Sequence, residues 1–216
     1  MSGAVDQYLS FVGAPSGSKP VPQERFDDFG NIFPSLLLEV WEQVGFAGFK
    51  KGFFWLCDPV EWAPAVAAWT KDLNPKMGQD NWHAIGRNAF GQMELWGERT
   101  GLSLIVEPVH GLIVPSQDAA SRMGTEQLRN NQIMALLYTT PTAKGLFGQD
   151  EKPLFDRAVK AHGEVGPDTL YSFVPAHALG GPLTVDHIEI ADAPTHVELL
   201  ADLSPRRVTG DITMSR

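Results

Sequence analysis

Four short apolar segments follow one another between residues 82 and 115, and this run constrains the fold more than any other part of the chain. The segments are residues 83–87, 92–96, 103–109 and 112–114. Polar or glycine-containing turns of a few residues separate them, as expected for consecutive strands. Connections this short join antiparallel neighbours, because a parallel pair needs a crossover of a dozen or more residues. The sequence therefore predicts an antiparallel meander.

Helical patterns lie on both sides of this meander along the chain. Leu37, Val40 and Trp41 fall at helical spacing, and Gly45 follows as a stop signal. Asp58-Pro59 predicts the start of another helix through a capping box, and further helices are expected at 128–137, 153–162 and 195–203. Strand clusters flanked by helices without regular β-α-β alternation favour an α+β fold, with helices packed on antiparallel sheets.

A chain of 216 residues suits one large domain or two small ones. Residues 12–24 are rich in Pro, Gly and Ser, and residues 118–126 form a polar stretch that can act as a hinge. We therefore expect two closely associated subdomains between an extended lead-in and a frayed tail. The predicted boundaries are 1–25 for the lead-in, 26–117 and 118–203 for the subdomains, and 204–216 for the tail.

The chain is acidic, with 26 acidic and 17 basic residues and a net charge of −9. The charge is spread evenly, at −5 in residues 1–110 and −4 in residues 111–216. A field of this sign repels nucleic acid and speeds the encounter with a basic partner. Many acidic proteins carry such charge for solubility alone, and the charge by itself leaves both interpretations open.

Several features point to the cytoplasm. No apolar run approaches the roughly 20 residues needed to cross a bilayer, and the N-terminus lacks the basic start and apolar run of a signal peptide. Cys57 is the single cysteine, which rules out an internal disulfide and fits a reducing compartment. We expect a cytoplasmic protein that does not contact a membrane.

No catalytic constellation emerges from the sequence. It contains no phosphate-binding loop, no nucleophile elbow and no pair of histidines with zinc-helix spacing. Cys57 ends an apolar strand, where a buried structural thiol is the simpler interpretation. The sequence thus predicts no catalytic residue, metal or cofactor. The alternative is a small enzyme or ligand-binding module with a pocket near Arg87, Tyr171 and His177.

Acidic residues with one tryptophan are the predicted partner-binding surface. Asp80, Glu94 and Glu98 lie in or beside the predicted meander, and Trp96 stands between the last two. Tryptophan is enriched at interface hot spots, and carboxylates attract a basic partner. We expect these four residues to be exposed and to contact a partner protein.

Three stretches occur in order along the chain, namely PSLLLEVWEQVGFAGFKKGFFWLCDPVEWAPAVAAW, HAIGRNAFGQMELWGE and GPDTLYSFVPAHALGG. Together with the following strand and Leu-rich helix they cover roughly residues 26–203, and they resemble the GAD-related domain family. His177 departs from the pattern, which has an apolar residue there. The resemblance implies an immunity protein that binds and neutralises a DNase toxin of the type VI secretion system. It carries over no catalytic residue.

The charge agrees with this expectation, because a DNase must present a basic groove to DNA and an acidic inhibitor can occupy the same surface. The expected partner is therefore the toxin protein, with no direct contact to nucleic acid. A regulatory protein outside toxin immunity is the remaining alternative.

Overall fold

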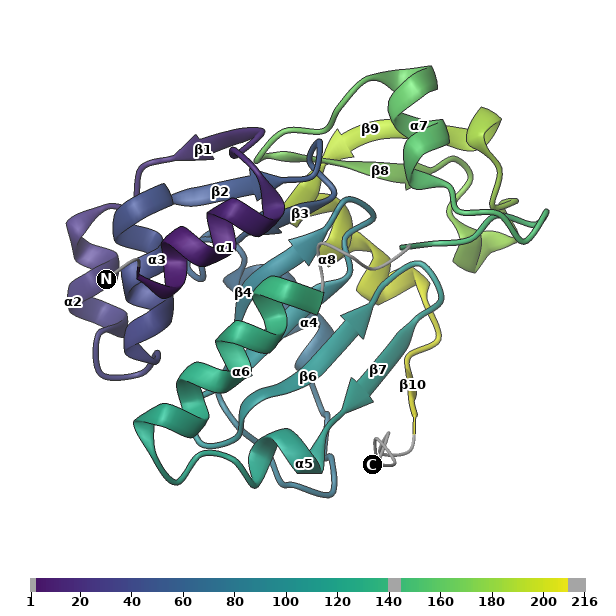
Figure 1. Cartoon of the computed structure of the whole chain (residues 1–216). Helices are drawn as coiled ribbons and strands as arrows, with labels where there is room; N and C mark the ends of the chain where they lie inside the picture. Colours follow the sequence, from purple (N-terminus) through teal and green to yellow (C-terminus); the bar gives the residue numbers. More distant parts are fainter. Residues whose placement is uncertain (1–2, 140–144, 210–216) are drawn as a thin grey trace.

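The chain folds as an α+β protein around one large twisted sheet (Figure 1). The computed structural model describes residues 3–139 and 145–209. In this part of the chain the large sheet has eight strands, in the order β1-β2-β3-β4-β5-β6-β7-β10. Its strands are β1 (Gly17–Lys19), β2 (Phe46–Phe49), β3 (Phe54–Leu56), β4 (Trp82–Asn88), β5 (Met93–Gly97), β6 (Gly101–Glu107), β7 (Leu112–Pro115) and β10 (Arg207–Val208).

Neighbouring strands from β1 to β7 pair antiparallel, so the predicted meander is confirmed in β4 to β7. The last strand, β10, joins the edge parallel to β7. A second sheet contains β8 (Thr169–Phe173) and β9 (Ile188–Asp192), which pair antiparallel. The strand β8 lies within the third stretch that resembles the GAD-related family, and β9 is the strand that follows this stretch.

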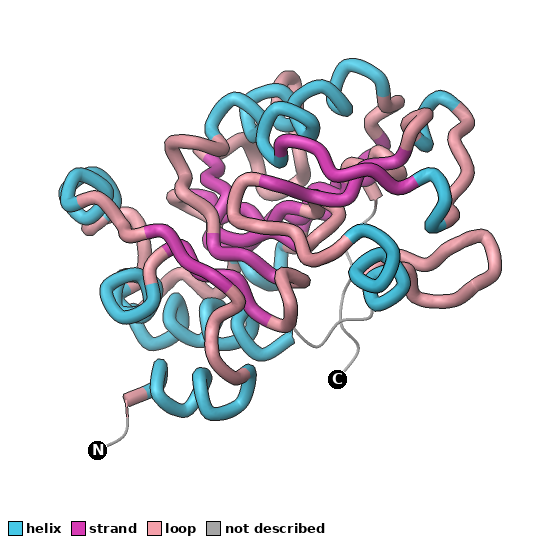
Figure 2. The backbone as a smooth tube through the Cα atoms, turned by 90° about the horizontal axis from the view of Figure 1, so that it is seen from above, coloured by secondary structure: helices cyan, strands magenta, loops and turns pink. Residues whose placement is uncertain are grey.

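Helices cover both faces of the large sheet (Figure 2). They are α1 (Ala4–Val12), α2 (Gln23–Phe29), α3 (Ser35–Val44), α4 (Ala63–Thr70), α5 (Gln117–Ala120), α6 (Glu126–Thr139), α7 (Phe155–His162) and α8 (Ala193–Leu203), with 3-10 turns η2 (His177–Leu179) and η3 (Val185–His187). One core lies under α1, α3 and α6, and a second lies under α4 and α8. Side chains alternate along a strand. Trp96 therefore enters the first core and Leu95 the second.

The N-terminal segment differs from the predicted extended lead-in. Residues 4–12 form α1, and Val5, Tyr8 and Val12 are buried against the first core. These residues lie at i, i+3 and i+7, so they form one helical stripe that packs on α3 and α6. The Pro-, Gly- and Ser-rich signal belongs to the residues that follow α1, which include the edge strand β1.

The predicted capping box at Asp58 is wrong, because α4 begins at Ala63. The Asp58 carboxylate accepts hydrogen bonds from the Val60 backbone N–H at 2.9 Å and from Arg25 Nε at 2.8 Å. It therefore holds a turn before the helix. Pro64 lies in the first turn of α4, where its missing N–H costs no hydrogen bond, so it starts the helix and does not bend it.

The C-terminal segment is also more ordered than the predicted frayed tail. Arg207 and Val208 form β10 on the edge of the sheet, and Arg206 donates to the carbonyls of Ala68 and Lys71 at the end of α4. Cations suit this position, because the last carbonyls of a helix lack intrahelical donors. Residues 210–216 of the predicted tail lie outside the described residues.

Arg87 on β4 connects the large sheet to the segment that leads into β8. Its side chain is fully buried, and Nη2 donates to three backbone carbonyls in residues 166–169 at 2.9 to 3.0 Å. The guanidinium lies 5.8 Å from the ring of Trp55 and 5.6 Å from that of Trp62. Burial lowers the pKa of Arg87 to about 10. Carbonyl dipoles and aromatic faces therefore hold this cation in the interior.

We expect Arg87→Met to destabilise the fold by about 3 kcal/mol, because it leaves buried carbonyls without donors. Urea unfolding measures this difference. The matched control is Arg122→Met, which removes an exposed arginine paired with Asp118 and should change the free energy of unfolding by less than about 1 kcal/mol. Equal losses in the two variants would contradict the structural role given to Arg87.

Candidate functional site

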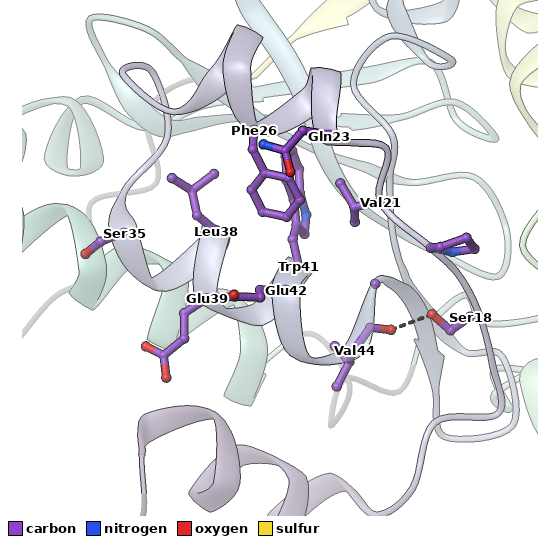
Figure 3. Close-up of a pocket in the computed structure, with 12 residues that line it drawn as sticks. Ser18, Val21, Gln23, Phe26, Ser35, Leu38, Glu39, Trp41, Glu42 and Val44 are labelled. Atoms are coloured by element: carbon purple, nitrogen blue, oxygen red, sulfur yellow. Dashed lines mark hydrogen bonds between the residues drawn. The ribbon is translucent and has the colours of Figure 1, made fainter.

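A groove of about 940 Å³ lies between α2 and α3 and is closed on one side by the segment that contains β1. Figure 3 shows its lining side chains, with Phe26 reaching from α2 toward Trp41 on α3. Its lining residues are Ser18, Pro20, Val21, Gln23, Phe26, Ser35, Leu38, Glu39, Trp41, Glu42, Val44 and Gly45. We call this feature the α2–α3 groove.

The floor of the groove is apolar and rigid. Trp41 is only 1% exposed, and its indole packs edge-on against Phe26, Phe33 and Phe46, with ring centroids 5.2 to 6.2 Å apart. Edge-to-face aromatic contacts of this kind hold rings in fixed orientations. Leu38 beside them is only partly buried. The groove thus keeps apolar surface accessible above a well-packed aromatic cluster.

Trp41 also carries a buried polar group without a partner. Among the described residues no acceptor lies within hydrogen-bonding distance of its indole N–H. Most buried polar groups in proteins are hydrogen-bonded, and each exception calls for an explanation. An acceptor from water or from a bound molecule is the ordinary way to satisfy such a group.

Acidic residues surround the floor. Residues 23–44 contain five acids and one arginine, a net charge of −4 out of −9 for the whole chain. The arginine is Arg25, which turns away to the Asp58 carboxylate. Glu42 is exposed and Glu39 is half-buried, and no cation in the described part of the chain pairs with either carboxylate. The rim of the groove is therefore negative.

Two uncharged polar side chains of the groove already have partners. The Ser18 hydroxyl donates to the Val44 carbonyl (Figure 3), and the Gln23 amide donates to Asp27 at 3.3 Å. The apolar floor, the Trp41 indole N–H and the carboxylates of the rim remain for a ligand. This arrangement suits an apolar group that is flanked by cations.

The structure corrects part of the predicted partner surface, because Trp96 is 0% exposed and Glu94 is 5% exposed. Both lie on β5, an interior strand between β4 and β6, and helices cover both faces of the sheet. The Arg129 guanidinium lies 5.8 Å from the Trp96 ring. Neither Glu94 nor Trp96 is therefore available at the surface in this conformation.

Asp80 and Glu98 lie near the turn between β5 and β6. The Asp80 carboxylate accepts from the backbone N–H groups of Arg99 and Thr100, at 3.1 and 2.8 Å, and from the Thr100 hydroxyl at 2.6 Å. It therefore fixes the turn. Glu98 is exposed and contacts His83 at 3.0 Å. The four predicted residues do not form one exposed patch, and contact of Asp80 or Glu98 with a partner stays a prediction.

The alternative pocket near Arg87, Tyr171 and His177 does not form as expected. Tyr171 donates to the Gly163 carbonyl, and the cavity beside Tyr171 and His177 measures about 10 Å³. That volume holds no more than about one water molecule. Arg87 does not line this cavity, because its guanidinium is engaged with residues 166–169.

The described residues contain no group of three or more His, Cys, Asp or Glu side chains placed to hold a metal ion. None of their helices has the length and apolar character needed to span a bilayer.

Two family matches cover most of the chain. Residues 4–110 match the GAD-like domain, and residues 126–204 match the C-terminal domain of the type VI secretion system immunity protein Tdi1. The chain belongs to the GAD-related type VI secretion immunity proteins. The resemblance inferred from the sequence is thereby confirmed, and a role in immunity implies a toxin as the partner of this immunity protein.

A solved structure shares the fold of this immunity protein. It is titled "Crystal structure of Atu4351 from Agrobacterium tumefaciens" and superposes with a TM-score of 0.84 at 22% sequence identity. The similarity covers 95% of this chain and 91% of that one. None of the curated proteins compared with the immunity protein matches it.

Glu94 gives a pH-dependent prediction. Burial raises its pKa to about 7, against a smaller opposing effect of the hydrogen bond from the Gln92 amide at 3.0 Å. The folded protein therefore binds this proton more tightly than the unfolded chain. The stabilising contribution is complete below about pH 4.5 and is lost as the pH rises through about 7.

We expect Glu94→Gln to be more stable than the parent at pH 8 by about 3 kcal/mol, and about equally stable at pH 4. Urea unfolding at the two pH values measures the difference. Glu98→Gln, on the exposed turn after the same strand, is the control and should leave the pH dependence of the parent in place. A Glu94→Gln protein that loses stability at pH 8 would show that the carboxylate has a stabilising partner there.

Proposed function

We propose that this immunity protein neutralises a DNase toxin of the type VI secretion system by forming a stoichiometric complex with it in the cytoplasm. The match of residues 126–204 to an immunity-protein domain carries the proposal. The immunity protein then inhibits the toxin by covering its surface, and no covalent bond is made or broken. The absence of a disulfide from a chain with a single cysteine is consistent with action in a reducing compartment.

Charge supports a nuclease as the target. An enzyme that cuts DNA must bind a polyanion, so it presents a basic surface. The immunity protein carries a net charge of −9 and concentrates −4 of it in residues 23–44. Opposite charges accelerate association, which matters for an inhibitor that must capture the toxin before it cuts the chromosome.

The single thiol gives little support to a nucleophilic enzyme. Cys57 is buried, and burial raises its pKa to about 12. The reactive form of cysteine is the thiolate, so a thiol with this pKa stays protonated and unreactive at neutral pH. Cys57 therefore serves as a packing residue of the second core.

Titration of the cognate toxin with this protein tests the proposal. We expect plasmid cleavage to fall linearly as the immunity protein is added and to stop at about one equivalent, since DNase–immunity pairs are among the tightest complexes known. No cofactor is needed. An unrelated DNase is the control and should keep its activity. Loss of toxin activity at a small fraction of one equivalent would contradict inhibition by complex formation. It would indicate that the immunity protein inactivates the toxin catalytically.

A further inference from the structure

We propose that the α2–α3 groove is the docking site for a basic, amphipathic segment of the toxin. An apolar side chain of this segment packs on the floor around Phe26, Leu38 and Trp41, and flanking Lys or Arg side chains pair with Glu39 and Glu42. The identity of the partner rests on the function proposed above. The chemistry of the segment rests on the groove itself.

The floor of the groove favours an apolar group of the partner. The volume of about 940 Å³ lies at the upper end of the roughly 300 to 1,000 Å³ of ligand pockets, so the groove has room for more than one side chain. Leu38 and Val44 remain partly exposed above Trp41, which is held by its aromatic neighbours. A preformed aromatic floor loses little conformational entropy on binding, and such floors favour hot spots.

The rim of the groove favours cationic groups of the partner. Glu39 and Glu42 are three residues apart on α3, so they project from neighbouring positions of one helix face. Three cations of the neighbouring segments are engaged elsewhere. Arg25 pairs with Asp58, and Lys19 pairs with Asp168 and Glu61. Lys50 lies 5.9 Å from the centroid of the Phe11 ring. Within the described residues no cation pairs with the carboxylates of Glu39 and Glu42, and these carboxylates are complementary to a basic surface.

The available polar groups favour a protein segment over a small metabolite. Small-molecule sites fix their ligand with a few convergent polar groups. Here Ser18 and Gln23 are satisfied by Val44 and Asp27, and Glu39 accepts from the Gln43 amide at 3.1 Å. An apolar side chain with neighbouring cations uses what the groove still offers.

Charge reversal tests the rim. The variant Glu39→Lys/Glu42→Lys is compared with Glu198→Lys/Asp202→Lys, which makes the same change of net charge at two exposed positions of α8. Binding of the catalytically inactivated toxin is followed kinetically at low and physiological salt. We expect the groove variant to associate about tenfold or more slowly at low salt, and the α8 variant to stay within about twofold of the parent.

A thiol placed in the groove tests the floor without changing its charge. Cys57 is buried with a pKa of about 12, so Leu38→Cys supplies the reactive thiol. The control is Leu199→Cys on α8, where the native side chain is 53% exposed. We expect bound toxin to slow maleimide labelling at position 38 by about tenfold or more, and to leave labelling at position 199 unchanged.

The outcomes separate the two proposals. If the parent protein does not bind the toxin, the proposed function fails. If the parent binds and inhibits while both groove variants behave like their α8 controls, the function stands and this docking site is wrong. Slow labelling at position 38 before any toxin is added, reversed by unfolding and dialysis, would identify a co-purified small ligand and overturn the proposal. Circular dichroism and urea midpoints confirm that each variant is folded.

Discussion

The buried guanidinium of Arg87 joins the central meander to the C-terminal half of the chain. It extends from β4, lies near the rings of Trp55 and Trp62, and donates hydrogen bonds to the carbonyls of Gly166 and Thr169 at the start of β8. A buried cation costs several kcal/mol of desolvation unless its donors are satisfied, so the position of residues 166–169 and that of β4 depend on each other. The second core, between the sheet and α4 and α8, forms around this connection.

The α2–α3 groove is formed by the N-terminal half of the chain and depends on a different interaction. Trp41 of α3 packs with Phe26 of α2 and with Phe46 of β2, so aromatic contacts connect α3 to both α2 and the sheet. The sheet supports α3 from below, and the groove presents apolar surface and carboxylates together. A protein that acts by occupying another molecule needs this kind of preorganised surface.

Local patterns in the sequence predict most of the helices and strands. The meander and α3 were predicted because strand alternation, turn residues and a helical stripe ending at Gly45 are local signals. The helix α1 was missed because its short stripe precedes a Pro- and Gly-rich segment that dominates the composition there. The burial of Trp96 and Glu94 could not be predicted, because it depends on helices from distant parts of the chain that cover β5. The groove could not be predicted for the same reason, because it forms only where α2 and the segment around β1 lie beside α3.

The immunity protein is proposed to act through a folded, acidic surface that the bound toxin covers. Hydrogen–deuterium exchange of the protein, alone and in complex with the toxin, tests this proposal. We expect slower exchange in α2, α3 and the segment around β1, while the interior strands β4 to β6 exchange as in the free protein. Protection confined to β8, β9 and α8, or exchange that toxin leaves unchanged, would contradict it.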